Sequence, residues 1–252
     1  MLKAGERLDE LRHGGMKLIQ SAASPCFALD ALLLADFVRL PAGARAIELG
    51  TGTGVISLLL AHKHPDCHIL GLELMPPLAE MARRSVELNR LEGQVEIRRG
   101  DIRRAGAELG KAGFDAVISN PPYFRVGAGR ANRDELDAAA RSEKYCSLEQ
   151  LLDAAYDLLK VRGLLFLIYR TDRAGELWGG LAARRLGLER LRMIQPYGDQ
   201  AANLMLVQAR KHGQGQTVIP PPLVVYDSPG CYSREMESIY DGHTVSGGHA
   251  HR

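Results

Sequence analysis

Residues 46–54 read Ala-Ile-Glu-Leu-Gly-Thr-Gly-Thr-Gly, "AIELGTGTG", an apolar run that contains one acid and ends in three alternating glycines. The pattern predicts a buried strand over 45–49, a tight turn, and a helix over 55–64. Glycines in such a turn let the backbone approach a ligand that a Cβ atom would repel. The spacing is G-x-G-x-G, whereas the dinucleotide fingerprint is G-x-G-x-x-G with a pyrophosphate at the helix N-terminus. Because Glu48 would repel a pyrophosphate, the turn favours a cationic ligand, such as one with an amino group and a sulfonium.

Strands and helices alternate downstream of this turn, and the alternation predicts an α/β fold with a mostly parallel sheet and helices on both faces. The expected strands are 45–49, 68–74, 94–101, 114–119, 163–170, 188–196 and 202–210. The expected helices are 55–64, 76–91, 147–160 and 173–186, the third with a capping box of Ser147 and Gln150 at its start. Only a few residues separate the last two strands, which suits a terminal antiparallel hairpin. The sheet should therefore have seven strands.

The expected organisation is a single domain over 1–240. A hairpin at 6–20 and an amphipathic helix at 27–40 form a small N-terminal extension, 1–42, ahead of the core at 43–211. Residues 212–240 are expected to cover the surface, with 217–240 irregular, and the Gly/His-rich residues 241–252 to form a disordered tail.

The composition limits which partners, locations and metal sites are expected. The 252 residues carry 32 Lys and Arg against 30 Asp and Glu, a net charge of +2 that permits nucleic acid as a partner without requiring it. Four scattered cysteines without a C-x-x-C motif fit a reducing cytosol, so a cytoplasmic location is expected. No apolar stretch reaches the roughly 20 residues of a membrane helix. No metal site is expected, because His62, His64 and His68 straddle Pro65 and lack partner ligands.

Two more acids end successive strands. Glu73 lies 19 residues past Gly54, where a carboxylate accepts hydrogen bonds from both hydroxyls of a ribose. Asp101 ends the third strand and can accept from an adenine amino group. With the glycine turn, these acids resemble the S-adenosylmethionine pocket of class I methyltransferases, which have a Rossmann-like fold. The resemblance implies cofactor contacts at Glu48, Gly50, Gly52, Gly54, Glu73, Asp101, Ile102 and Asn120.

The fourth strand runs into Asn120-Pro121-Pro122-Tyr123. Prolines end a strand because they donate no hydrogen bond and fix φ. The four residues resemble the [D/N/S]-P-P-[Y/F/W] motif of enzymes that methylate adenine N6, guanine N2 or a glutamine amide. Such a nitrogen is a poor nucleophile, because its lone pair is delocalised. The side-chain carbonyl of Asn120 and the backbone carbonyl of Pro121 can accept from the NH₂ group and aim its lone pair at the methyl group, while Tyr123 stacks on the base.

Further segments extend the likeness over most of the chain. With the turn and the Asn-Pro-Pro-Tyr motif, residues 5–11, 16–21, 27–37 and 221–227 resemble a bacterial family of N6-adenine methyltransferases that modify the adenine 3′ of the anticodon in a valine tRNA. The resemblance implies S-adenosylmethionine as cofactor and RNA, specifically tRNA, as partner. It also makes Asp30 a cofactor candidate, although a carboxylate there equally complements the helix dipole.

Alternatives stay open at this point. Asn120 in place of Asp also fits a protein-glutamine methyltransferase, and a binding module without turnover would keep the same residues. A dehydrogenase fits least, because of Glu48 and the G-x-G-x-G spacing.

Substrate contacts are expected beyond the motif. The basic loop 124–144 can grip phosphates, although its acids nearly cancel its charge, and the fifth strand ends in an arginine on the pocket side. The candidate substrate-binding residues are Tyr123, Phe124, Arg125, Arg141 and Arg170.

Overall fold

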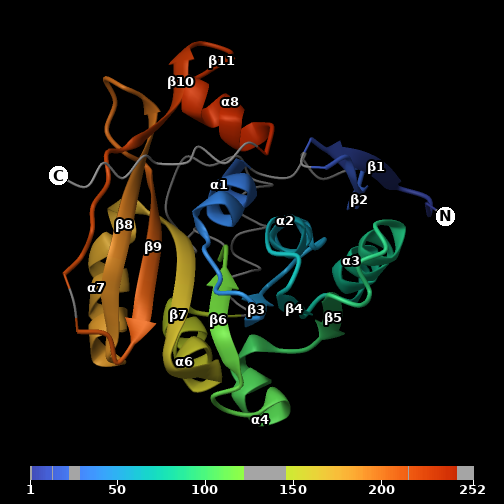
Figure 1. Cartoon of the computed structure of the whole chain (residues 1–252), viewed down its shortest axis with the longest axis horizontal. Coiled ribbons are helices and arrows are strands. Elements are labelled where there is room, and N and C mark those ends of the chain that lie inside the picture. The colour runs from blue at the N-terminus through green and yellow to red at the C-terminus, as the bar shows by residue number, and fades with distance from the viewer. Residues whose placement is uncertain (1, 13, 23–28, 122–145, 215, 243–252) are drawn as a thin grey trace.

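The computed structural model describes the whole chain except residues 1, 13, 23–28, 122–145, 215 and 243–252 (Figure 1). Over the described residues, a two-stranded sheet pairs β1 with β2, and a nine-stranded sheet has the order β11-β10-β8-β9-β7-β6-β3-β4-β5. The strands of the large sheet are β3 (Arg45–Leu49), β4 (His68–Glu73), β5 (Val95–Arg99), β6 (Phe114–Ser119), β7 (Leu159–Arg170), β8 (Leu186–Tyr197), β9 (Leu204–Lys211), β10 (Leu223–Ser228) and β11 (Cys231–Tyr232).

The sheet is mostly parallel, as predicted. β3 pairs in parallel with β4 and β6, β4 with β5, and β6 with β7. β9 lies between β7 and β8 and runs antiparallel to both, which confirms the predicted antiparallel hairpin. The carboxyl ends of the parallel strands therefore meet at one edge of the sheet.

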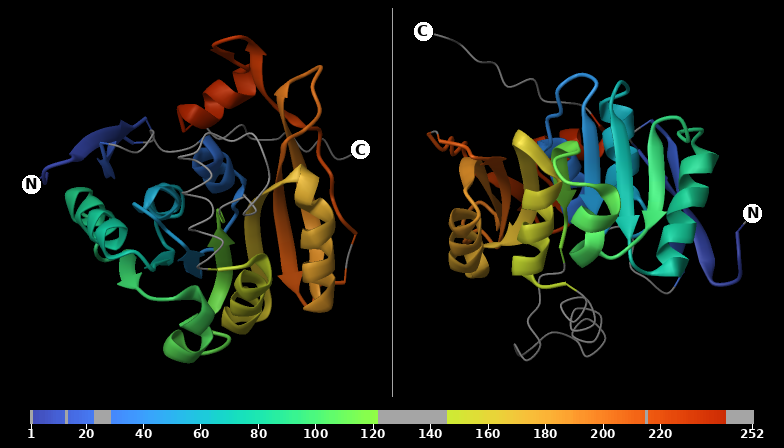
Figure 2. Two further views of the ribbon diagram at one scale, coloured as in Figure 1. Left: turned by 180° about the vertical axis from the view of Figure 1, so that it is seen from behind. Right: turned by 90° about the horizontal axis from the view of Figure 1, so that it is seen from below.

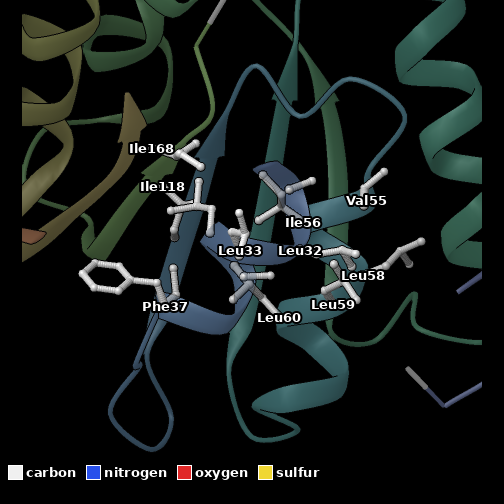
Figure 3. Close-up of a cluster of buried hydrophobic side chains, with 14 of the residues drawn as sticks. Leu32, Leu33, Phe37, Val55, Ile56, Leu58, Leu59, Leu60, Ile118 and Ile168 are labelled. Atoms are coloured by element: carbon white, nitrogen blue, oxygen red, sulfur yellow. The ribbon is translucent and has the colours of Figure 1, made fainter. Parts of the chain in front are cut away.

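Helices cover both faces of the sheet, also as predicted (Figure 1). One face packs against α1 (Leu29–Phe37), α2 (Val55–Lys63), α3 (Pro76–Leu88) and α8 (Arg234–Tyr240). The other packs against α4 (Ala105–Leu109), α6 (Leu148–Leu158) and α7 (Ala174–Ala183). Successive residues of β6 serve the two cores, since Ile118 faces α1 and α2 (Figure 3) and Val117 faces α6. Each large apolar side chain buried in this way contributes about 1.5–3 kcal/mol.

Polar caps fix the ends of two helices. The ammonium of Lys63 donates to the carbonyl oxygens of Ala35 (3.0 Å), Asp36 and Val38 (3.1 Å) at the C-terminal end of α1, where no intrahelical donor is left. Burial lowers the pKa of Lys63 to about 8. At the start of α6, Ser147 and Gln150 form the predicted capping box.

The N-terminal extension has the predicted hairpin, β1 (Glu6–Leu11) and β2 (Met16–Ser21). The hairpin lies against α3, at the end of the molecule opposite α7 (Figures 1 and 2). The amide of Ile19 donates to Ser85 Oγ at 2.9 Å, and Arg84 donates to the carboxylate of Glu6 at 2.8 Å. α1 then leads into the core.

The sheet extends past the seven predicted strands, and the expectation of an irregular strip at 217–240 is wrong. Leu223 and Val225 of β10 are buried, and β10 pairs in parallel with β8 through Leu223 and Ile194. β11 and α8 then complete this part of the fold. A short helical segment, η1 (Ile102–Arg104) and α4, was also not predicted.

Over the described residues, no helix has the length and apolar character needed to cross a membrane. The division into 1–42, 43–211 and 212–240 stays a prediction, and the predicted tail lies mostly outside the described residues.

Candidate active site

A pocket opens where β3 and β6 end. It is lined by Gly50 of the glycine turn, by the start of the Asn-Pro-Pro-Tyr motif and by residues of α6 and β7. The other predicted cofactor residues of the turn and the strand ends do not line it: Glu48, Gly52, Gly54, Glu73 and Asp101. Its lining residues are Leu49, Gly50, Ile102, Ser119, Asn120, Pro121, Cys146, Ser147, Leu148, Leu151 and Tyr169. Two motifs that lie about 70 positions apart in the sequence thus share one pocket. The hydroxyl of Ser119 donates to the carbonyl oxygen of Leu49 at 2.8 Å and ties the two strand ends together.

The glycines of the turn have two different tasks. Gly50, Gly52 and Gly54 have φ values of 77°, 59° and 91°, in the left-handed region that favours glycine. A Cβ on Gly52 would meet no atom of the described residues within 4 Å, so the backbone there faces open space in the described part of the structure. A Cβ on Gly54 would lie 3.2 Å from the Cβ of Ala82 in α3. Gly52 therefore leaves room for a ligand, whereas Gly54 lets two helices approach each other.

Glu73 is held against the same turn. Its carboxylate accepts hydrogen bonds from the amides of Gly52 and Met75, both at 2.8 Å, and the residue is only 7% exposed. Each carboxylate oxygen can accept a second hydrogen bond. Glu73 is therefore fixed in position with acceptor capacity left over, and its contact with ribose hydroxyls stays a prediction.

Glu48 lies beneath the turn. It is 2% exposed, and one of its oxygens accepts from the hydroxyls of Thr51 (2.7 Å) and Ser57 (2.5 Å). Burial raises the pKa of Glu48 to about 7, and the neighbouring Glu73 adds to the rise. A cationic ligand above the turn would favour the ionised form of Glu48. Direct contact with the ligand stays a prediction.

Asp101 precedes η1 and is already paired. It accepts from the amide of Arg103 at 2.9 Å and from its guanidinium at 2.5 Å, and these bonds lower the pKa of Asp101. An adenine amino group would have to share this carboxylate with Arg103. Ile102 lies next to Gly50 in the pocket lining, so it offers an apolar surface to a bound ring.

The remaining predicted residues fall into two groups. Asp30 is half-buried in the first turn of α1, and Arg170 ends β7, where it pairs with Asp172 at 2.8 Å. Neither lines the pocket. Their predicted contacts stay untested, as do those of Pro122, Tyr123, Phe124, Arg125 and Arg141, which lie outside the described residues.

Seven lining residues were not predicted as site residues, among them Tyr169 and Cys146, which carry polar groups from outside the two motifs. Tyr169 precedes Arg170 and is 1% exposed, and because successive side chains of a strand alternate, it faces the pocket where Arg170 does not. Burial raises the pKa of Cys146 to about 11, which makes it a neutral wall residue. In the part of the chain that is described, no group of three or more His, Cys, Asp or Glu could hold a metal ion.

Comparisons with known proteins place this pocket in a family. The family model described as "methyltransferase small domain" matches residues 29–175, more than half of the chain. A tRNA1(Val) (adenine(37)-N6)-methyltransferase of Porphyromonas gingivalis is 31% identical over 202 residues, 77% of this chain and 78% of the relative. The chain belongs to this methyltransferase family. The resemblance inferred from the motifs is thus confirmed, and with it S-adenosylmethionine as the cofactor.

Solved structures confirm the fold of this methyltransferase. A protein of Agrobacterium tumefaciens described as a predicted O-methyltransferase superposes with a TM-score of 0.68 at 24% identity, over 85% of this chain and 96% of that one. A Listeria monocytogenes protein described as a class I S-adenosylmethionine-dependent methyltransferase gives a TM-score of 0.55 at 15% identity, over 84% and 68% of the two chains. At these identities the likeness concerns the fold alone.

Proposed function

We propose that this methyltransferase transfers a methyl group from S-adenosylmethionine to N6 of an adenine in RNA, and that the substrate is adenine 37 of tRNA1(Val). One observation carries the proposal. Gly50 of the glycine turn and the Asn120-Pro121 pair line a single pocket, so a cofactor held by the turn lies beside acceptors suited to an NH₂ group. The activity in the relative's name supports the choice of adenine and of tRNA. An RNA substrate of this kind also supports a cytoplasmic location.

The residues of the turn fit S-adenosylmethionine. The open backbone at Gly52 leaves room for it, Glu73 has acceptor capacity for the ribose, and Asp101 and Ile102 suit an adenine ring. When bound, this cofactor supplies a methyl group on a positively charged sulfur. The buried carboxylate of Glu48 favours that positive charge in its neighbourhood.

Asn120 and Pro121 prepare the nucleophile. The side-chain oxygen of Asn120 and the backbone oxygen of Pro121 each accept one hydrogen bond from the exocyclic amine, which turns the nitrogen lone pair towards the methyl group. Because Pro121 has a fixed φ and lies two residues past Ser119, the last residue of β6, little conformational freedom is lost on reaching the reactive geometry. The reaction needs no strong base, since the extra proton leaves the amine after the transfer.

The test is methylation of RNA by the whole protein. Labelled S-adenosylmethionine is incubated with bacterial tRNA and with bacterial protein, and digested nucleosides are analysed by mass. We expect N6-methyladenosine in tRNA1(Val) and its loss in Asn120→Ala, whose cofactor affinity is measured alongside. Label in glutamine, or no label despite cofactor binding, would contradict the proposal and favour a glutamine methyltransferase or a binding module.

A further inference from the structure

A second cavity opens on the face of the sheet that α1 and α8 cover. It lies between α1, β8, β9 and α8, and it shares no residue with the active-site pocket. Three arginines line it together with an aromatic ring, and we call it the arginine groove. Its defining residues are Phe37, Arg39, Arg190 and Arg192.

Strand register fixes the place of this groove in the sheet. Arg190 of β8 pairs with Gln208 of β9, and Gln208 pairs with Phe166 of β7. Phe166 precedes Arg170, the last residue of β7, by four positions, which is about 13 Å along a strand. Along the strands, Arg190 therefore lies about 13 Å from the edge at which the active-site pocket opens. Across the sheet, β9 and β7 separate β8 from β6, which adds about 14 Å. Arg192 is two positions closer to that edge and on the same face.

Arg190 is the unusual residue of the groove. Its guanidinium lies over the ring of Phe37, 4.6 Å from the ring centroid, and the residue is half-buried. Over the described residues, no carboxylate lies within ion-pair distance of it. Stacking occupies one face of the guanidinium and leaves its planar N–H edge available for an anion.

The acids near the groove all have their own cations. Asp36 lies 3.7 Å from Lys63, Glu189 pairs with Arg210, and Glu235 pairs with Arg192 at 2.8 Å. The groove also contains Arg39, whose guanidinium donates to the backbone oxygens of Asp36 and Val38. Burial and the charges of Arg39 and Arg192 lower the pKa of Arg190. Two neighbouring guanidiniums thus lack a carboxylate partner in the described structure, and an anion between them would relieve their repulsion.

We propose that the arginine groove binds the phosphodiester backbone of the substrate RNA, a few nucleotides from the methylated base. This inference rests on the proposed function. The planar N–H edge of a guanidinium matches the oxygens of a phosphate group. Arg39 is exposed at the groove, so a long polyanion can reach it. A stacked strand advances about 3.4 Å per nucleotide, so the combined separation of about 19 Å corresponds to about six nucleotides. The contact would add affinity and orientation without reading sequence.

The test is RNA binding by the double variant Arg39→Gln/Arg190→Gln without cofactor. The matched control is Arg98→Gln/Lys111→Gln, which removes two equal charges from exposed sites remote from the groove. We expect the groove variant to raise the Kd for tRNA about tenfold, and to lower the slope of log K against log salt by about 1–2. The control should stay within twofold of the wild-type Kd. At saturating tRNA, kcat should be unchanged, so the loss appears in KM.

Three outcomes decide the proposal. A Kd and a salt slope equal to those of the control would overturn it. So would micromolar binding of pyrophosphate that disappears in the groove variant while tRNA binding persists, because the groove would then serve a small anion. Arg190→Lys, which keeps the charge, should fold normally and retain most of the salt slope. Binding needs no methyl transfer, so a wild-type protein that binds RNA through the groove without methylating it would refute the proposed function alone.

Discussion

Substituting Gly52 by alanine separates ligand contact from backbone strain, because the chain offers a matched control. Gly52 (φ 59°) and Gly43 (φ 68°) have similar left-handed backbones, and a Cβ on either would meet no atom within 4 Å among the residues that the structure describes. An L-residue in this region costs about 1–2 kcal/mol. For a chain of this size, both variants should therefore melt about 2–8 °C below the wild type. Only the methyl group on Gly52 would enter the space assigned to the cofactor.

The assay is titration calorimetry with S-adenosylmethionine beside thermal unfolding. We expect Gly52→Ala to weaken cofactor binding at least tenfold, which is about 1.4 kcal/mol, and Gly43→Ala to bind as the wild type does. If Gly52→Ala binds the cofactor with unchanged affinity, the turn does not face the ligand. If both variants lose affinity equally, strain in the fold explains the loss, and the reasoning from open space at Gly52 is wrong.

Three further predictions concern the site and its support. Glu48 has its pKa raised to about 7 in the folded protein, so its protonated form stabilises the fold at low pH, and this stability is lost as the pH rises from about 4.5 through 7. Glu48→Gln should flatten this pH dependence in denaturant unfolding curves. S-adenosylmethionine should bind the wild type more tightly at pH 8 than at pH 6. Glu73→Gln keeps an acceptor oxygen for only one of the amides of Gly52 and Met75, and it should raise the cofactor Kd about 10- to 100-fold in calorimetry. Ser147→Ala removes the cap of α6 and should cost about 1 kcal/mol of unfolding free energy, measured by urea titration.

The strands that carry the site were predictable because local sequence marks both of their ends. The bounds of β3 and β6 agree with the prediction, since glycine or proline follows each apolar run. β10 was missed because it directly follows Pro220–Pro222, which indicate a loop, and its pairing with β8 is a long-range contact that the local sequence does not show. The five-residue α4 is too short to show helical periodicity.

The positions of the site residues were predictable to the strand end, but their hydrogen-bond partners were not. Sequence placed Asp101 at the end of a strand, and the structure adds that Arg103 holds its carboxylate. Sequence likewise assigned Glu48 to the ligand, and the structure gives it two hydroxyl donors from within the turn and the following helix. Such partners depend on side-chain directions across a turn, which residue spacing does not encode.

The two halves of the proposed reaction depend on one junction of the sheet. Ser119 ends β6 and donates to the carbonyl oxygen of Leu49, the last residue of β3. The next residue after Leu49 begins the glycine turn, and the next after Ser119 is Asn120. The cofactor turn and the amine acceptors are therefore held in register by adjacent parallel strands, not by the loops that follow them. A displacement of β6 against β3 would separate the methyl donor from the nucleophile without removing any residue that contacts either. Disrupting the contact between Ser119 and Leu49 should therefore lower kcat more than it lowers the affinity for the cofactor or the RNA.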